Sequence, residues 1–275
     1  RPCEPIDRNG DNLKEAVLQY ADLWNLGDGF KAWINEKNVF CNILVDRINT
    51  GYPKGEDVGL PYEDNMVNTS EFFHLWVIET DYDLEKELPF TKAGLNVIVT
   101  RDQLERYRTR KVRILNGAHT SMVAYGLLSG LETVKDCMDD ETMRTFVRAC
   151  LFEEIIPTLD MPKEELLEYA DSVLVRFANP YIKHYLAAIS LNSISKFKVR
   201  VLPSLLEYRK RFGKNPEHLI LGLAKLIEFY QNGTPSDAED VIAAIRGKSV
   251  EDVLANTALW GTDLSDLAEA VKAAK

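Results

Sequence analysis

The spacing of apolar residues from Asp102 almost to the C-terminus is the feature that most limits the fold. These residues recur about every three to four positions, which is the period of helices that bury one face. Pro162 and Pro216 stand at first-turn positions of such segments, and the Asn179-Pro180 pair forces a break between two of them. The sequence therefore predicts a mainly α fold with many helices in this part of the chain.

The N-terminal part has a different pattern. A helix is expected over residues 11–25, and a short apolar run follows from Phe40 to Ile48. Phe72 to Glu79 and Asn96 to Thr100 are rich in aromatic and β-branched residues, as strands are. We expect these two segments to form a small β element.

A loop rich in Gly, Pro, Asp and Asn covers residues 49–69 and is the best candidate for a domain boundary. We therefore divide the chain into residues 1–66 and a helical substrate and catalytic domain over residues 67–275. The Gly27-Asp28-Gly29 turn, followed by Ala32, matches the spacing of a dinucleotide-binding loop. That motif requires a preceding strand, and a predicted helix precedes it here. A turn between two helices explains it better, so the cofactor-binding residues remain unknown.

Composition excludes several classes of protein. The 275 residues are 45% hydrophobic, enough for a sizeable core, and a net charge of -10 without a basic stripe argues against a nucleic-acid partner. No apolar run has the length of a membrane span, and no signal peptide is present. The cysteines lack regular spacing, which indicates reduced thiols and a cytoplasmic location; they are Cys3, Cys41, Cys137 and Cys150.

A lysine, a carboxamide and an imidazole fall close together within the helical region. Lys111, Asn116 and His119 project at roughly 0°, 140° and 80° around a regular helix, so all three can face one cavity. A base and two hydrogen-bond donors are what polarising a carbonyl or deprotonating an alcohol requires. Such a grouping also arises by chance. Gly117 adds a position where another group can approach the backbone closely.

No metal site is predicted, because the histidines show no HxxE or HxH spacing; they are His74, His119, His184 and His218.

Four blocks of sequence, in the same order, resemble the polyol-specific long-chain dehydrogenases, the mannitol dehydrogenase family. The first contains Lys111-x4-Asn116-x2-His119, which is similar to the catalytic motif of that family. The blocks are Lys111 to Gly130, Phe40 to Pro53, Phe73 to Glu79 and Arg176 to Pro203.

The resemblance implies a reversible hydride transfer between NAD and a sugar carbonyl, in which the cofactor carries the difficult chemistry. Lys111 would be the general acid and base, with a pKa depressed by partial burial. Asn116 would donate to the developing alkoxide, and His119 would orient the substrate oxygen. Val45 and Asp46 would lie near the substrate, although the Asp46-Arg47 pair also fits a surface charge pair.

A second polar cluster covers Ser190 to Lys196 between two apolar helices. From the residues alone, a solvated turn between helices explains it. The resemblance implies that Lys196 reaches the hydroxyls of the substrate. Asn192 and His184 are weaker candidates for substrate binding, and His184 also fits a surface histidine.

Two positions depart from the family pattern. An arginine of mannitol dehydrogenases is replaced by Ala188, and an asparagine of their oxyanion site is replaced within Cys3-Glu4-Pro5. Asn9 is a candidate substitute for that asparagine. These differences indicate a reshaped site for a sugar acid, with Lys196 as the charge partner of its carboxylate. The blocks indicate tagaturonate and altronate as substrate and product, with mannitol or fructuronate (mannonate) dehydrogenation as alternatives.

Members of this family carry a nucleotide-binding domain before the matched region. We therefore expect residues 1–66 to be the trailing part of a Rossmann-like domain, with NAD bound mainly by a domain absent from this chain. That N-terminal domain would be the partner of the helical part. A helical interaction module without enzymatic activity is the alternative from another class. The oligomeric state, NAD against NADP and the direction of the reaction in the cell cannot be predicted.

Overall fold

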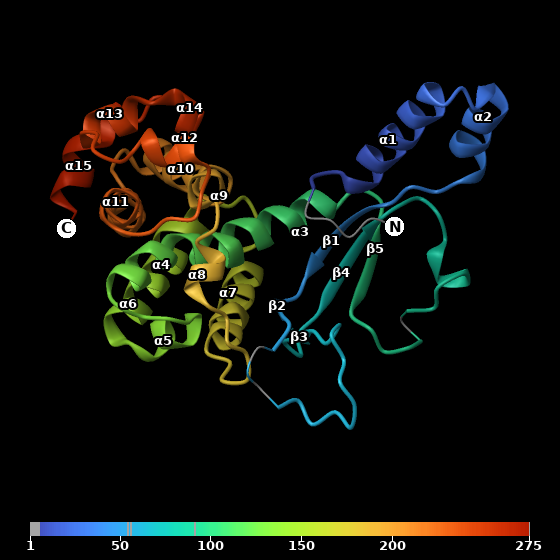
Figure 1. Cartoon of the computed structure of the whole chain (residues 1–275), viewed down its shortest axis with the longest axis horizontal. Coiled ribbons are helices and arrows are strands. Elements are labelled where there is room, and N and C mark those ends of the chain that lie inside the picture. Colours follow the sequence, from blue (N-terminus) through green and yellow to red (C-terminus); the bar gives the residue numbers. More distant parts are fainter. Residues whose placement is uncertain (1–5, 54, 56, 91, 275) are drawn as a thin grey trace. The chain divides into compact units, whose positions relative to one another are not determined.

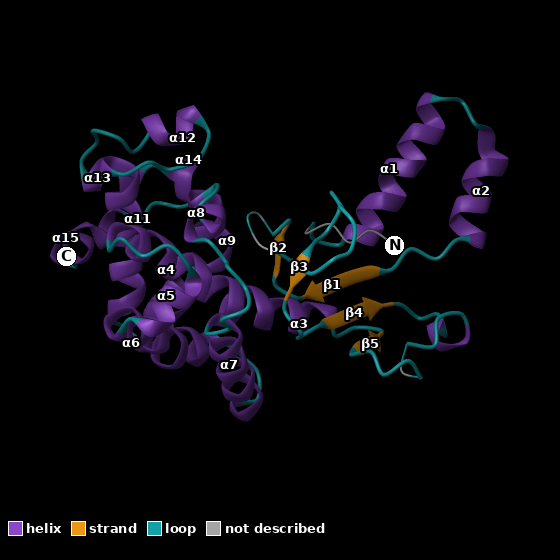
Figure 2. Ribbon diagram, turned by 60° about the horizontal axis from the view of Figure 1, so that its bottom comes forward, coloured by secondary structure: helices purple, strands orange, loops and turns teal. Residues whose placement is uncertain are grey.

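The computed structural model describes residues 6–53, 55, 57–90 and 92–274, and it contains two compact units, Arg1–Thr109 and Arg110–Lys275. All the strands of the described residues lie in the first unit, and the second unit consists of helices and loops (Figure 2). The prediction of a mainly helical chain with a small β element is confirmed. No helix among the described residues is long and apolar enough to cross a membrane.

The first unit begins with two helices and continues with short strands. The strands form a three-stranded sheet of order β1-β4-β5, with β1 antiparallel and β5 parallel to β4, and a separate antiparallel pair, β2-β3 (Figure 1). The elements are α1 (Asn9–Leu23), α2 (Gly27–Lys37), β1 (Asn42–Asp46), β2 (Asn49–Gly51), β3 (Thr69–Ser70), β4 (Leu75–Glu79), η1 (Leu84–Lys86), β5 (Val97–Thr100) and α3 (Leu104–Arg110), which runs into the second unit.

Both faces of the three-stranded sheet carry apolar side chains, which explains the nearly continuous apolar run of its central strand. Alternate residues of a strand point to opposite faces. Ile78 therefore packs with Cys41 and Ile43 on one face, while Val77 packs with Leu104 on the other. The strands predicted at Phe72–Glu79 and Asn96–Thr100 are thus confirmed as β4 and β5.

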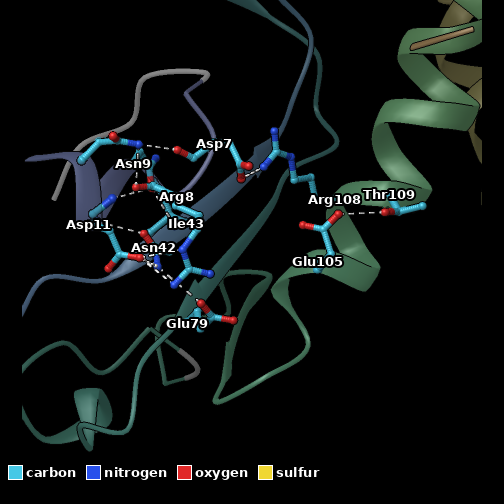
Figure 3. A network of polar contacts seen from close by, with 12 residues as sticks. Asp7, Arg8, Asn9, Asp11, Asn42, Ile43, Glu79, Glu105, Arg108 and Thr109 are labelled. Carbon is cyan, nitrogen blue, oxygen red and sulfur yellow. Dashed lines mark hydrogen bonds and ion pairs between the residues drawn. The ribbon is translucent and has the colours of Figure 1, made fainter. Parts of the chain in front are cut away.

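Helix α1 is fixed to strand β1 by a buried amide (Figure 3). The Asn9 Oδ1 atom accepts hydrogen bonds from the backbone N–H groups of Gly10 at 3.0 Å and Ile43 at 2.9 Å. A Cβ atom at Gly10 would lie 2.3 Å from the carbonyl oxygen of Cys41, so only glycine allows this approach. Two adjacent residues, Asn9 and Gly10, therefore fix α1 against β1.

The second unit is built from short and medium helices, two of them π-helical. Its elements are the π-helix η2 (Lys111–Asn116), α4 (Gly117–Leu128), α5 (Val134–Asp139), α6 (Glu141–Ala149), the π-helix η3 (Cys150–Ile155), η4 (Ile156–Thr158), α7 (Lys163–Phe177), α8 (Leu186–Ile189), α9 (Ser193–Arg200), α10 (Leu202–Phe212), α11 (Glu217–Asn232), α12 (Glu239–Ala243), α13 (Val250–Ala255), α14 (Thr257–Trp260), η5 (Ser265–Leu267) and α15 (Ala268–Ala273).

Helix α4 is the central helix of this unit. It packs against α11, α8, α9 and α6, and nine of its residues are buried, including His119, Thr120 and Ser121. Glycines allow the closest approaches. A Cβ atom at Gly126 would lie 2.8 Å from Leu186 Cδ1, and one at Gly222 of α11 would lie 3.3 Å from the carbonyl of Ser121. The apolar stripes found in the sequence therefore meet around α4.

The division of the chain into two units differs from the one predicted from the sequence. The two units divide at Thr109 and Arg110, whereas the predicted division was at residues 66/67. The reason is that β4, which follows the loop over 49–69, pairs with β1, which precedes it. The Gly27-Asp28-Gly29 turn joins α1 to α2, so its interpretation as a turn between helices is confirmed.

We expect Asn9→Ala to lower the free energy of unfolding by about 1–3 kcal/mol, because two N–H groups near β1 would lose their acceptor. Denaturant unfolding checks this prediction. Asn35→Ala is the matched control, since Asn35 is exposed on α2 and bonds only to Lys31 within its helix. Equal losses in the two variants would contradict the role given to Asn9.

Candidate active site

The Lys-Asn-His motif lies where a π-helix passes into an α-helix. Lys111 and Asn116 are the first and last residues of η2, and His119 lies in the first turn of α4. In a π-helix the hydrogen bonds run from residue i to residue i+5, so residues five apart lie one turn above each other. The backbone N–H of Gly117 accordingly reaches the carbonyl of Val112. Lys111 and Asn116 are thus closer to one face than the regular helix assumed from the sequence allows.

Gly117 stands at the end of this π-helix and faces α9. A Cβ atom here would lie 3.3 Å from the carbonyl oxygen of Arg200 and 3.7 Å from a methyl group of Ile155. The expected close approach at Gly117 is confirmed, and the approaching group is the end of α9. This contact brings residues of α9 beside the motif.

The imidazole of His119 is buried and held between rings. It is 4% exposed, stacks on Phe177 at 4.1 Å between ring centroids, and meets the edge of His184 at 4.9 Å. Its Nε2 atom has no hydrogen-bond partner among the described residues. Since buried polar atoms are nearly always paired, this atom is a candidate to bind an oxygen of a substrate.

The electrostatic surroundings keep His119 uncharged. Burial lowers the pKa of its imidazole well below the usual value, and electrostatic repulsion from His184, when protonated, and from Arg200, Arg176 and Lys111 lowers it further. Lys111 is thus close enough for its charge to act on His119. Burial also lowers the pKa of His184 to about 4, so both rings are neutral near neutral pH.

His184 lies in a segment that the backbone holds in place. Its carbonyl accepts a hydrogen bond from the N–H of Val134 at 3.0 Å, and Thr133 forms an isolated bridge with Tyr185. The edge contact with His119 makes this partly exposed ring part of the same cluster, and its part in substrate binding stays a prediction.

Lys196 and Asn192 belong to the turn that begins α9. The Lys196 Nζ atom donates to the carbonyl of Ile189 at 2.8 Å, and burial together with the charge of Arg200 lowers the pKa of its ammonium group. Asn192 is exposed and left-handed, with φ 54°. Its backbone N–H donates to Ser236 at 2.9 Å, so it shapes the turn, and its part in substrate binding stays a prediction.

Two arginines were missed in the sequence. Arg176 is buried on α7, and Arg200 ends α9, with its Nη1 atom 3.5 Å from Thr120 Oγ1. Both charges act on His119. Arg200 follows Lys196 by four positions, which places the two cations on one face of a helix. That spacing was the signal that could have identified it.

The remaining candidates lie in the first unit. Asp46 is 1% exposed at the end of β1, and Val45 is 39% exposed. Their predicted role near the substrate stays a prediction. Asn9 uses its carbonyl oxygen to hold α1 on β1, and its part in an oxyanion site stays a prediction. Cys3-Glu4-Pro5 lies outside the described residues.

Among the described residues, no group of three or more His, Cys, Asp or Glu side chains could hold a metal ion.

Comparisons with known proteins place this site in a family. The model of the mannitol dehydrogenase C-terminal domain matches residues 103–275, and that of the mannitol dehydrogenase Rossmann domain matches residues 2–92. The chain belongs to the mannitol dehydrogenase family. The second match agrees that the N-terminal residues belong to a Rossmann domain, and it corrects the expectation that NAD is bound mainly by a domain absent from this chain. It also extends that domain beyond residue 66.

Curated relatives resemble nearly the whole chain. Altronate oxidoreductase of Bacillus subtilis is 45% identical over 97% of this chain, and that of Yersinia enterocolitica is 43% identical over 96%. The chain covers 58% and 59% of these relatives, so it spans about three fifths of their length.

Solved structures share the fold. Pseudomonas fluorescens mannitol 2-dehydrogenase, solved as a ternary complex with NAD and D-mannitol, has a TM-score of 0.73 at 24% identity and covers 99% of this chain. The chain covers 57% of that structure. A D-sorbitol dehydrogenase in substrate-free form has a TM-score of 0.77 at 25% identity, covers 99% of this chain and is itself covered over 61%.

The two buried imidazoles predict a loss of stability in acid. An unfolded histidine takes up a proton near pH 6.5, whereas folded His184 does so only near pH 4, and the pKa of folded His119 also lies well below its usual value. The unfolded state therefore binds more protons below pH 6.5, and the free energy of unfolding falls from about pH 6.5 toward pH 4. Urea titrations across this range measure it.

In His119→Gln/His184→Gln this decline should be shallower, because the groups responsible are gone. His74→Gln is the control, since His74 lies in the first unit. An equally steep decline in the double variant would show that the two imidazoles titrate normally in the folded protein.

Proposed function

We propose that the protein containing this chain is an NAD-dependent oxidoreductase that interconverts tagaturonate and altronate. The observation that carries the proposal is the buried, uncharged His119, whose Nε2 lacks a partner beside the charge of Lys111. The relatives named altronate oxidoreductase support the choice of a sugar acid. Their greater length makes the activity of the whole protein a proposal.

Lys111 and Asn116 would act on the same reacting oxygen in different ways. In reduction, Lys111 gives a proton to the carbonyl oxygen as it becomes an alcohol, and in oxidation it removes that proton. Asn116 donates a hydrogen bond to the same oxygen while negative charge develops there. Their positions at the two ends of one π-helical turn support this shared role.

His119 would orient the substrate. A neutral imidazole with its proton on Nε2 donates a hydrogen bond without releasing that proton, and the low pKa of His119 keeps the ring neutral. Stacking on Phe177 and contact with His184 limit rotation of the ring. A fixed donor costs little reorganisation during the reaction.

NAD would supply or accept the hydride when bound. Among the described residues, no glycine-rich turn joins a strand to a helix, so the usual support for a pyrophosphate is not found in them. No residue of this chain is therefore assigned to the cofactor. The proton chemistry of Lys111, Asn116 and His119 depends only on the second unit.

Lys111→Ala should lower kcat by about 10² to 10⁴ in the protein at its natural length, the usual range for general acid–base catalysis. Steady-state kinetics in both directions measure the effect. Lys135→Ala is the control, because Lys135 lies on α5 and pairs only with Asp139. Unchanged turnover in Lys111→Ala would remove this lysine from the mechanism.

A second prediction concerns the substrate. The values of kcat/KM should rank tagaturonate first, fructuronate second and fructose last, because fructose has no carboxylate. A preference for fructose by tenfold or more, about 1.4 kcal/mol of discrimination between transition states, would overturn the assignment to sugar acids. In that case the protein would be a mannitol dehydrogenase.

A further inference from the structure

The side chain of Arg200 is partly buried and has no acidic partner among the described residues. This burial lowers the pKa of Arg200, and no carboxylate of the described residues offsets that effect. Within the same residues, its side chain makes one polar contact, the 3.5 Å approach to Thr120 Oγ1. Buried charges in proteins are normally paired, because an unpaired one loses its hydration without compensation. The surroundings of this arginine are therefore those of an anion-binding group.

The position of Arg200 connects it to the site. Thr120 follows His119 directly in α4, and the carbonyl of Arg200 lies against Gly117 at the end of the π-helix. The charge of Arg200 acts on both His119 and Lys196. An anion beside the guanidinium would thus lie next to the residues proposed to handle the reacting oxygen.

Lys196 and Arg200 form a pair of like charges at i and i+4 on α9. Such pairs destabilise a helix, and partial burial of both side chains increases the repulsion. An anion between them would remove it. Lys196 already donates to the carbonyl of Ile189, whereas the forked guanidinium of Arg200 can still bind a carboxylate through two parallel hydrogen bonds.

We propose that Arg200 binds the terminal carboxylate of the sugar-acid substrate and so determines specificity for acids over neutral sugars. This inference rests on the proposed function, and it replaces the expectation that Lys196 is the main partner of that carboxylate. Lys196 then supports the same anion from the neighbouring turn of α9.

The test compares Arg200→Gln with the unmodified protein at natural length, using tagaturonate and fructose as substrates. For tagaturonate, kcat/KM should fall by about 100-fold or more, as expected when one member of a buried charge pair is removed. For fructose it should change by less than about threefold. Arg200→Lys should recover part of the loss, because it keeps the charge without the fork. Lys198→Gln, the same change of charge on the same helix, should alter neither value.

A stability measurement separates binding from a structural role. Arg200→Gln should melt at the same or a higher temperature without ligand, since it removes a partly buried charge without an acidic partner among the described residues. It should also lose the upward shift that altronate gives the unmodified protein. Equal losses on both substrates, or a lower melting temperature with the altronate shift intact, would overturn the role of Arg200. If the unmodified protein itself prefers fructose, the proposed function fails first, whatever Arg200 does.

Discussion

The close approach of α4 to its neighbours is the constraint on which the second unit depends. Gly117, Gly126 and Gly222 each replace a side chain at a point where helices touch, so the backbone of α4 is packed on several sides. A helix fixed in this way cannot shift to relieve local strain, and its π-helical entry at Lys111–Asn116 is held with it. The packing of α4 therefore fixes the orientation of the Lys111-Asn116-His119 motif, because these residues lie on the same rigid backbone.

The same packing explains the electrostatics of the site. Enclosing His119 between Phe177 and His184 removes water, which disfavours the protonated ring, and the arginines on α7 and α9 act in the same direction. Elsewhere in this unit a buried charge is compensated, since the carboxylate of Glu154 accepts hydrogen bonds from the backbone N–H groups of His218 and Leu219. Among the described residues, no carboxylate compensates the charge of Arg200 in the same way.

Part of this arrangement could be predicted from the sequence, and the physical reasons are clear. Helical periodicity, proline positions and the Lys111-Asn116-His119 spacing are local signals, so the helices and the motif were found. The pairing of β1 with β4 across the loop over 49–69 is a contact between distant segments, which explains the different division of the chain. The π-helix was missed because no residue type specifies it. Arg200 was missed because an arginine near the end of a helix is ordinary. Its spacing of four residues from Lys196 is a weak signal, and its partial burial is a tertiary feature that the sequence does not show.

The charge of the chain as a whole adds a last consequence for binding. The net charge of -10 on these 275 residues repels an anionic substrate at long range, so this part of the protein does not attract it from a distance. A site for a sugar acid in such a protein must act through short contacts in a partly desolvated place, where salt screens little and hydrogen bonds to charged groups are strong. In the proposed function, Arg200 beside Thr120, the neutral ring of His119 and the lysine that begins the π-helix would supply contacts of this kind. Their usefulness depends on the packing of α4 against α9, which brings these side chains to one place.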